Sequence, residues 1–211
     1  MKTEQLVESL VADRARSATS LSRSVARAVA LGSVLSLGIF VLELGPRVDL
    51  AAAFATWRFD FKLVLVLTAL LAAASACIAL ARPLASRSWR RGVVVLAVLA
   101  VSGLAIELML APAGSWGTRL VGSNARDCLK AIPVLALGPL LGLLLVLRRS
   151  APASPILAGA ASGALAAAAA AVLYAFHCFD DSPLFVLTWY PLAAVPVILL
   201  GAVVGHRLLR W

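Results

Sequence analysis

The chain has 211 residues, of which 62% are hydrophobic and 14% are charged, and its mean hydropathy is +0.98. A water-soluble domain of this length would have too little polar surface to cover so much Ala, Leu and Val, so the composition excludes an ordinary soluble protein and indicates a chain surrounded mostly by lipid. The formal net charge of +9 does not indicate direct binding of nucleic acid. The basic residues lie in the gaps between apolar runs, as signals of membrane orientation do.

The first segment, residues 1–24, is polar and mixed, unlike the rest of the chain. Its apolar residues recur at helical spacing with charged residues mostly on the opposite side, which predicts a short amphipathic helix. The apolar face would hold Leu6, Val7, Leu10 and Val11, with Asp13 among the charged residues. The Ser/Thr-rich stretch Ser17–Ser24 is typical of a linker. An isolated helix this short is marginal in water, so we expect it to become ordered only against a partner.

The remaining residues, 25–211, contain six apolar runs, each about long enough to cross roughly 30 Å of hydrocarbon as a helix. They are Val25–Leu44, Leu63–Ala81, Gly92–Ala111, Ala131–Leu147, Pro155–Phe176 and Leu184–Leu208. The sequence therefore predicts an all-α, polytopic membrane domain of six transmembrane helices embedded in a lipid bilayer. Gly159 and Gly163 in the fifth run predict close approach of a second helix, from the same chain or from another copy.

The distribution of Lys and Arg predicts the orientation of these helices. An even number of spans puts both termini on one side, and that side carries thirteen of the 19 basic residues. The positive-inside rule then places both termini in the cytoplasm of a bacterial inner membrane. On the opposite side, Leu50–Trp57 is expected to form a short interfacial helix between the first two spans.

The stretch from His177 to Pro183 is a short polar interruption between the last two apolar runs, and it contains no Lys or Arg. Its Cys178 and the more distant Cys128 are both expected just outside the membrane on the outer side. Such a pair could form a disulfide in an oxidising compartment, if the two Cα atoms lie within about 7 Å. Cys77, inside the second run, is expected to be a packing residue.

A soft-metal site is the alternative interpretation of the same residues. Cys128, Cys178 and His177 would hold a transient heavy-metal ion, and Asp180 or Asp181 would complete the site. The two thiols could also be unrelated, since two cysteines and a histidine do not make a motif.

Enzymatic function finds little support in the sequence. It contains no His-Glu-x-x-His, no Gly-x-Ser-x-Gly and no phosphate-binding glycine loop. Acidic residues that would mark an ion path are nearly absent from the spans, because Glu43 and Glu107 lie near outer ends and are expected to reach the interface. We therefore predict a protein that is not an enzyme. A carrier of small molecules or ions and a membrane thiol oxidoreductase remain as alternatives.

Several local signatures together resemble the NrsF family (negative regulator of sigma F), a family of six-span, inner-membrane anti-sigma factors. The resemblance covers essentially the whole chain. It is carried by Met1–Leu6, Arg58–Lys62, Asp127–Pro133, His177–Phe185 with Trp189 and Tyr190, and Gly205–Trp211.

The resemblance implies a function. Such proteins hold an extracytoplasmic-function sigma factor at the membrane, away from the RNA polymerase core, until a stress signal releases it. Residues 1–24 correspond to the short cytoplasmic N-terminus of the family and would bind the sigma factor. From their helical spacing, we expect Leu6, Val7, Leu10 and Val11 to be the anchors; a helix lying among the lipid headgroups is the alternative. Cys128 and Cys178 correspond to the paired outer-face cysteines of the family, and would take part in sensing heavy-metal or oxidative stress.

Overall fold

The computed structural model describes residues 3–82 and 87–210, and the side chains from residue 20 onward within those ranges. Every secondary-structure element in these ranges is helical, which confirms the all-α prediction for them. The elements are α1 (Thr3–Ile39), the π-helical segment η1 (Phe40–Leu44), α2 (Leu50–Ala53), α3 (Trp57–Leu80), α4 (Trp89–Leu110), the 3₁₀ turn η2 (Ala113–Ser115), α5 (Trp116–Val121), α6 (Ala125–Leu147), α7 (Pro155–Ala175) and α8 (Pro183–Leu208).

Six stretches of helix are long and apolar enough to cross a membrane, as the sequence predicts. They are Ser20–Leu44, Trp57–Leu80, Trp89–Leu110, Ala125–Leu147, Pro155–Ala175 and Pro183–Leu208. Several begin earlier than the apolar runs, because helices start at capping residues rather than at the first apolar one. In α3, for example, the Thr56 side chain accepts a hydrogen bond from the Phe59 backbone N–H at 3.4 Å.

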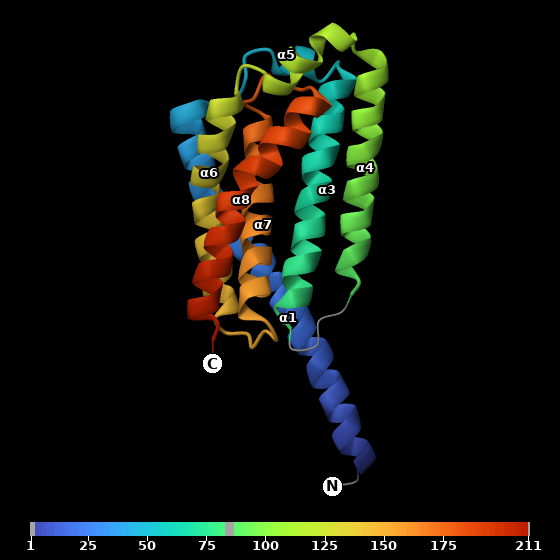
Figure 1. The fold of residues 1–211 in the computed structure, drawn as a ribbon. Helices are drawn as coiled ribbons and strands as arrows, with labels where there is room; N and C mark the ends of the chain where they lie inside the picture. Colours follow the sequence, from blue (N-terminus) through green and yellow to red (C-terminus); the bar gives the residue numbers. More distant parts are fainter. Residues whose placement is uncertain (1–2, 83–86, 211) are drawn as a thin grey trace.

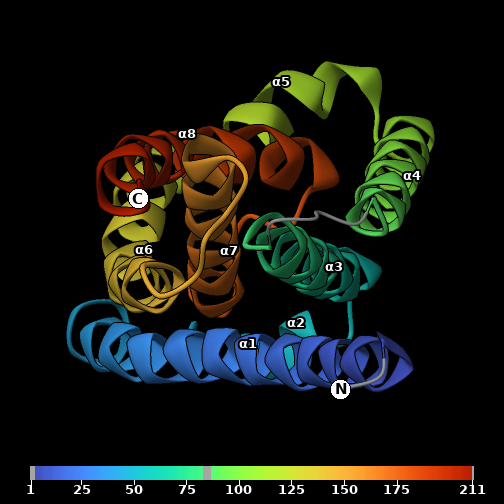
Figure 2. The ribbon, with the colours of Figure 1, turned by 90° about the horizontal axis from the view of Figure 1, so that it is seen from below.

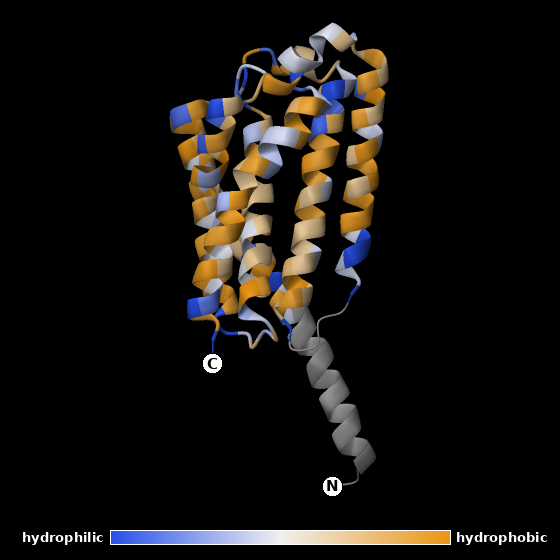
Figure 3. Cartoon of the chain, in the orientation of Figure 1, coloured by the Kyte–Doolittle hydropathy of each residue, from blue (hydrophilic) through white to orange (hydrophobic). Residues whose placement is uncertain are grey.

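The long helices form one bundle, in which α1 begins and α8 ends at the same end, while α5 covers the opposite end (Figure 1). We refer to the latter as the α5 end. Seen along the bundle, α1 lies along one side, next to α6 and α7, and α4 lies at the periphery beyond α3 (Figure 2). The outward surfaces of the helices are largely hydrophobic along their length, and hydrophilic residues gather at the two ends (Figure 3).

Helix α1 differs from its prediction. It runs without a break from Thr3 to Ile39 and continues as η1, so the linker expected at Ser17–Ser24 is wrong. Ser costs only a few tenths of a kcal/mol in a helix interior relative to Ala. Extending a helix that has already formed is much easier than nucleating a new one. The interfacial helix expected at Leu50–Trp57 is also shorter than predicted, because it is the single turn α2.

Close packing of small residues joins α7 to α8, which confirms the prediction from Gly159 and Gly163 with a partner in the same chain. A Cβ atom at Gly159 would lie 2.2 Å from the carbonyl oxygen of Gly201, and one at Gly163 would lie 2.5 Å from that of Val197. The two backbones are therefore in direct contact, an approach that small residues allow in membrane helices. Helix α7 is the most buried of the six spans.

Substituting Gly159 by Ala should destabilise the bundle. The new methyl group would collide with the α8 backbone, and overpacking of this kind costs about 1–3 kcal/mol. Gly38→Ala is the matched control, because a Cβ at Gly38 meets nothing within 4 Å. Thermal unfolding of the two variants in detergent, followed by circular dichroism, should show a lower midpoint for Gly159→Ala. Equal midpoints would contradict the packing described here.

Candidate functional site

The loop between α7 and α8, residues 176–182, carries Cys178 and is called the cysteine loop below. Cys178 is fully buried, and its Sγ donates a hydrogen bond to the carbonyl oxygen of Asp180 at 3.7 Å. Cys128 is equally buried, in the first turn of α6. Both thiols belong to the hydrophobic core and lie at the α5 end of the bundle, Cys128 in the first turn of α6 and Cys178 in the cysteine loop (Figure 1). The structure therefore places the two predicted cysteines at the same end, but inside the protein rather than on its outer surface.

The thiols are in their reduced, unbridged form: Cys77, Cys128 and Cys178 are all free. A disulfide between Cys128 and Cys178 stays a prediction. Burial raises the pKa of the Cys178 thiol to about 11, so this thiol is protonated near neutral pH. A protonated thiol is a weak nucleophile, so the surrounding structure protects Cys178 from reaction. Cys77 packs in the core 3.7 Å from the Ser162 hydroxyl, in agreement with its predicted packing role.

A group of ion pairs, the charged cluster, lies directly against the cysteine loop. It consists of Arg47, Asp49, Lys62 and Asp181. The Asp181 carboxylate binds the Arg47 guanidinium at 2.8 Å and also binds the Lys62 ammonium. Lys62 is fully buried, and its Nζ donates a second hydrogen bond to the Cys178 carbonyl oxygen at 2.8 Å. The cluster thus binds both the Asp181 side chain and the backbone of Cys178.

Arg47 is the residue of the cluster with the most partners. Its Nε donates to Asp49 at 2.7 Å, and its Nη1 donates to the Cys178 carbonyl oxygen at 3.2 Å. The carboxylates of Asp49 and Asp181 raise the pKa of Arg47, although burial acts in the opposite direction. The guanidinium in turn lowers the pKa of Asp49. Arg47 and Asp49 therefore stay charged at neutral pH, and their attraction persists.

A second ion-pair group surrounds Glu107, where the expectation of an interfacial side chain is wrong. Glu107 is fully buried, and its carboxylate accepts hydrogen bonds from Arg58 at 2.9 Å and from Arg119 at 3.2 Å. The Ser182 hydroxyl donates to the same carboxylate at 2.9 Å. α5 supplies Arg119 and the cysteine loop supplies Ser182, so two connecting segments cover this side chain.

The remaining polar residues of the cysteine loop are also bound by the protein. Asp180 Oδ2 accepts hydrogen bonds from the backbone N–H groups of Ser123 and Asn124 at 2.9 and 2.8 Å. The Asn124 side-chain amide donates to the same oxygen at 2.9 Å. His177 Nδ1 lies 2.9 Å from the carbonyl oxygen of Gly45. The loop is therefore attached to α3, to α4, to the segment after η1 and to the turn before α6.

These attachments bear on the predicted metal site. Among the side chains that the structure describes, no three from His, Cys, Asp and Glu converge as metal ligands would. The imidazole of His177 and the carboxylates of Asp180 and Asp181 already bind other groups of the protein. The arrangement does not fit a preformed metal centre, and an ion would have to displace these partners. Metal binding by Cys128, Cys178 and His177 stays a prediction.

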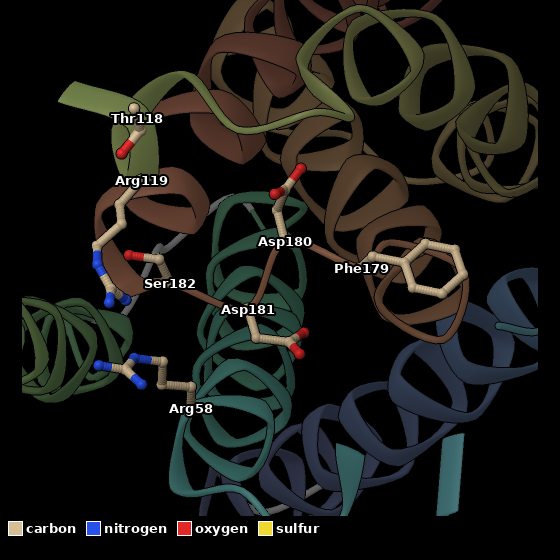
Figure 4. Close-up of a pocket in the computed structure, with 7 residues that line it drawn as sticks. All are labelled: Arg58, Thr118, Arg119, Phe179, Asp180, Asp181 and Ser182. Carbon is tan, nitrogen blue, oxygen red and sulfur yellow. The ribbon is translucent and has the colours of Figure 1, made fainter. Parts of the chain in front are cut away.

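A shallow, open hollow of about 340 Å³ lies over the cysteine loop at the α5 end. Figure 4 shows its side chains, with Arg58 and Arg119 on one side and the two loop aspartates beside them. Each of the four charged side chains is bonded to a protein partner. The lining residues are Arg58, Thr118, Arg119, Phe179, Asp180, Asp181 and Ser182.

The predicted sigma-binding residues Leu6, Val7, Leu10, Val11 and Asp13 have side chains outside the described residues. Their backbone belongs to α1. Their role stays a prediction.

Sequence reasoning missed the buried ion pairs of Arg47, Lys62 and Glu107. Arg47 and Lys62 count in the sequence only as two of the basic residues on the outer side. A usable signal for Lys62 was present, because Arg58 and Lys62 are four residues apart and therefore share one face of α3. These two basic residues lie at the end of the bundle that also carries Asp180 and Asp181. Their position favours ion pairs between a basic residue of α3 and an aspartate of the cysteine loop.

The whole chain is similar to proteins of one family. The family model described as "Negative regulator of sigma F" (NrsF) matches residues 10–211. The chain is 34% identical to the "Anti-sigma-F factor NrsF" of Caulobacter vibrioides (strain NA1000 / CB15N), and 30% identical to the "Probable anti-sigma-F factor NrsF" of Azospira oryzae (strain ATCC BAA-33 / DSM 13638 / PS). Both similarities cover 100% of this chain and 100% of the relative. No solved structure matches the chain significantly.

Replacing Asp181 by Asn should strongly destabilise the protein. The substitution leaves Arg47 and Lys62 buried without their shared carboxylate, and breaking a buried pair costs about 3–5 kcal/mol. Asp49→Asn is the control, because the Asp49 side chain is 44% exposed and Arg47 keeps Asp181. Thermal unfolding in detergent should show a much larger loss for Asp181→Asn. Similar losses for the two variants would mean that the charged cluster does not stabilise the fold in this way.

Proposed function

The chain belongs to the NrsF family of negative regulators of sigma F, and from this membership we propose that it is a membrane anti-sigma factor. It spans the bacterial inner membrane with six helices, and its N and C termini lie in the cytoplasm. It sequesters an extracytoplasmic-function sigma factor there, as a regulator rather than an enzyme. The observation that carries the proposal is full-length similarity to two proteins named as anti-sigma-F factors. Six helices long and apolar enough to span a membrane support it.

The sigma factor binds the N-terminal part of α1. This part extends past the other helices at the end of the bundle where α8 also ends (Figure 1). A helix that extends beyond the bundle can lay its apolar face into a groove of a partner protein. Leu6, Val7, Leu10 and Val11 recur at helical spacing, so they serve as the anchors, with Asp13 on the charged side.

The signal acts on Cys128 and Cys178. A soft metal ion can bind the two sulfurs with release of their protons. Alternatively, a peroxide oxidises the pair: an S–S bond forms, both thiol protons and two electrons leave, and the peroxide is reduced to water or an alcohol. The burial of the two thiols in one cluster supports a common response. His177, Asp180 and Asp181 contribute by holding the cysteine loop in place.

The double substitution Leu6→Asp and Leu10→Asp should abolish capture of the sigma factor, because it places two charges on the apolar face. A control with the same added charges at Ser17 and Ser20 should capture it as the parent does. The measurement is a pull-down of the cell's sigma factors by the detergent-solubilised full-length protein. Undiminished capture by the Leu6/Leu10 variant would disprove the assigned anchors, and no capture by the parent would disprove the anti-sigma function.

Replacing both outer cysteines should abolish release of the sigma factor without affecting its capture. Cys128→Ser with Cys178→Ser is expected to retain the sigma factor but not to release it under metal or peroxide stress. The readout is a reporter transcribed from a promoter of that sigma factor, and Cys77→Ser is the control. Full induction in the double variant would show that the thiols are not the sensor.

A further inference from the structure

The outer end of α1 and the cysteine loop are joined by three contacts, which we call the α1–loop contact. His177 Nδ1 lies 2.9 Å from the Gly45 carbonyl oxygen, and the Arg47 N–H donates to the Phe176 carbonyl oxygen at 2.9 Å. The Arg47 guanidinium donates to the Cys178 carbonyl oxygen at 3.2 Å. The backbone of the residue that carries the sensor thiol is thus bonded to the segment that directly follows η1.

Arg47 is held so firmly that it must move together with the loop. Its side chain is 5% exposed and lies between the carboxylates of Asp49 and Asp181, at 2.7 and 2.8 Å. The guanidinium also lies over the rings of Phe59 and Phe179, 5.6 and 4.9 Å from their centroids. A displacement of the loop therefore cannot leave Arg47 in place without breaking buried ion pairs, which are costly to break.

The segment η1 is a π-helical turn that directly continues α1. The Gly45 N–H donates to the Phe40 carbonyl oxygen at 2.7 Å, a five-residue hydrogen bond of π type. Such turns are rare and are frequently found at functional sites. Conversion to an α-turn would shift the helix register by one residue. His177 touches both ends of η1, through the Gly45 carbonyl oxygen and through an edge contact with the Phe40 ring at 6.5 Å.

From η1, the chain continues without a break to the N-terminal segment. In its C-terminal third, α1 packs on α6 over about two turns centred on Gly32: the Ser36 hydroxyl donates to the Leu135 carbonyl oxygen at 2.6 Å, Gly32 packs on the backbone of Pro139, and Gly142 packs on the Ala28 carbonyl oxygen. The stretch from this contact to Gly45 is about 20 Å long and the stretch to Thr3 roughly 43 Å, at 1.5 Å per residue. A tilt of α1 about the α6 contact therefore moves the N-terminal end about twice as far as the outer end.

We propose that the α1–loop contact and α1 are the path by which a change at Cys178 reaches the bound partner. A shift of the cysteine loop passes through Arg47 and His177 into η1, and α1 then tilts as one unit about its contact with α6. This inference rests on the proposed function, because the partner is the sigma factor held by the N-terminal segment. A substitution that breaks the α1–loop contact should mimic the signal. A break in α1 between the N-terminal segment and the contact with α6 should stop the signal from reaching the partner.

The test uses full-length protein in lipid vesicles and Hg²⁺ as the thiol-binding probe, which displaces thiol protons on binding. Arg47→Gln should weaken sigma-factor capture by about tenfold without Hg²⁺, and Hg²⁺ should change it no further. Arg126→Gln is the matched control, because it removes an exposed basic side chain at the same end. It should capture and release the sigma factor as the parent does.

A second variant acts on α1 itself. Ser20→Pro removes a helix hydrogen bond before the first span and interrupts the helix there. It should capture the sigma factor normally but not release it with Hg²⁺, whereas Ser20→Ala should do both. If Arg47→Gln and Ser20→Pro both capture and release as the parent does, the path is wrong, although capture by the parent would still support the anti-sigma function.

A measurement that does not use the sigma factor tests the signal path independently of the anti-sigma function. Hg²⁺ should change the rate of trypsin cleavage after Arg14 and Arg16 several-fold in the parent and in Arg126→Gln, measured by mass spectrometry. In Arg47→Gln, the rate should not respond. Equal responses in all three proteins would overturn the path even if no sigma factor is captured. A response that Arg47→Gln abolishes would support the path even if the anti-sigma function failed.

Discussion

The Asp181 carboxylate, buried between Arg47 and Lys62, is the interaction on which the α5 end of the structure depends. Taking a basic side chain out of water costs several kcal/mol, and only a carboxylate and well-placed carbonyl groups compensate for it. Lys62 obtains both from the cysteine loop, as Asp181 and the Cys178 carbonyl oxygen. The loop must therefore close over α3 for Lys62 to be buried, and this closure also buries Cys178.

The thiol and the backbone carbonyl group of the buried Cys178 have different partners. The thiol lies in the core and donates to the Asp180 carbonyl oxygen, while the carbonyl oxygen of Cys178 itself accepts hydrogen bonds from Arg47 and Lys62. A reaction that displaces the sulfur further than rotation of the Cα–Cβ bond allows moves this backbone too, because side chain and carbonyl share one Cα. A displacement of the sulfur can therefore act on the ion pairs without a change of charge at the sulfur.

The sequence predicts the bundle well and the ion pairs poorly, for a physical reason. Span length and composition are local properties, so the six apolar runs identify the six long helices. The error at Ser17–Ser24 is also local, since weak helix formers were given more weight than the cost of nucleating a new helix. The partners of Lys62 and Glu107 are not local. Lys62 binds the backbone of Cys178, 116 residues away, and Glu107 binds Ser182, 75 residues away. Only the folded loop brings them together.

Close backbone contacts at glycines join α1 to α6, α7 to α8 and α3 to α4, and one outer cysteine is associated with each of the first two pairs. Gly32 of α1 packs on Pro139 of α6, the helix that carries Cys128. Gly159 of α7 packs on Gly201 of α8, and Cys178 lies in the loop between these helices. Such contacts leave no room for sliding within a pair, because a shift would drive backbone atoms into each other. A bond or an ion that changes the separation of the thiols therefore acts between the pairs. Helix α1 packs on α6, which carries Cys128, and is bonded to the loop that carries Cys178. The tilt of α1 therefore depends on the separation of the two thiols.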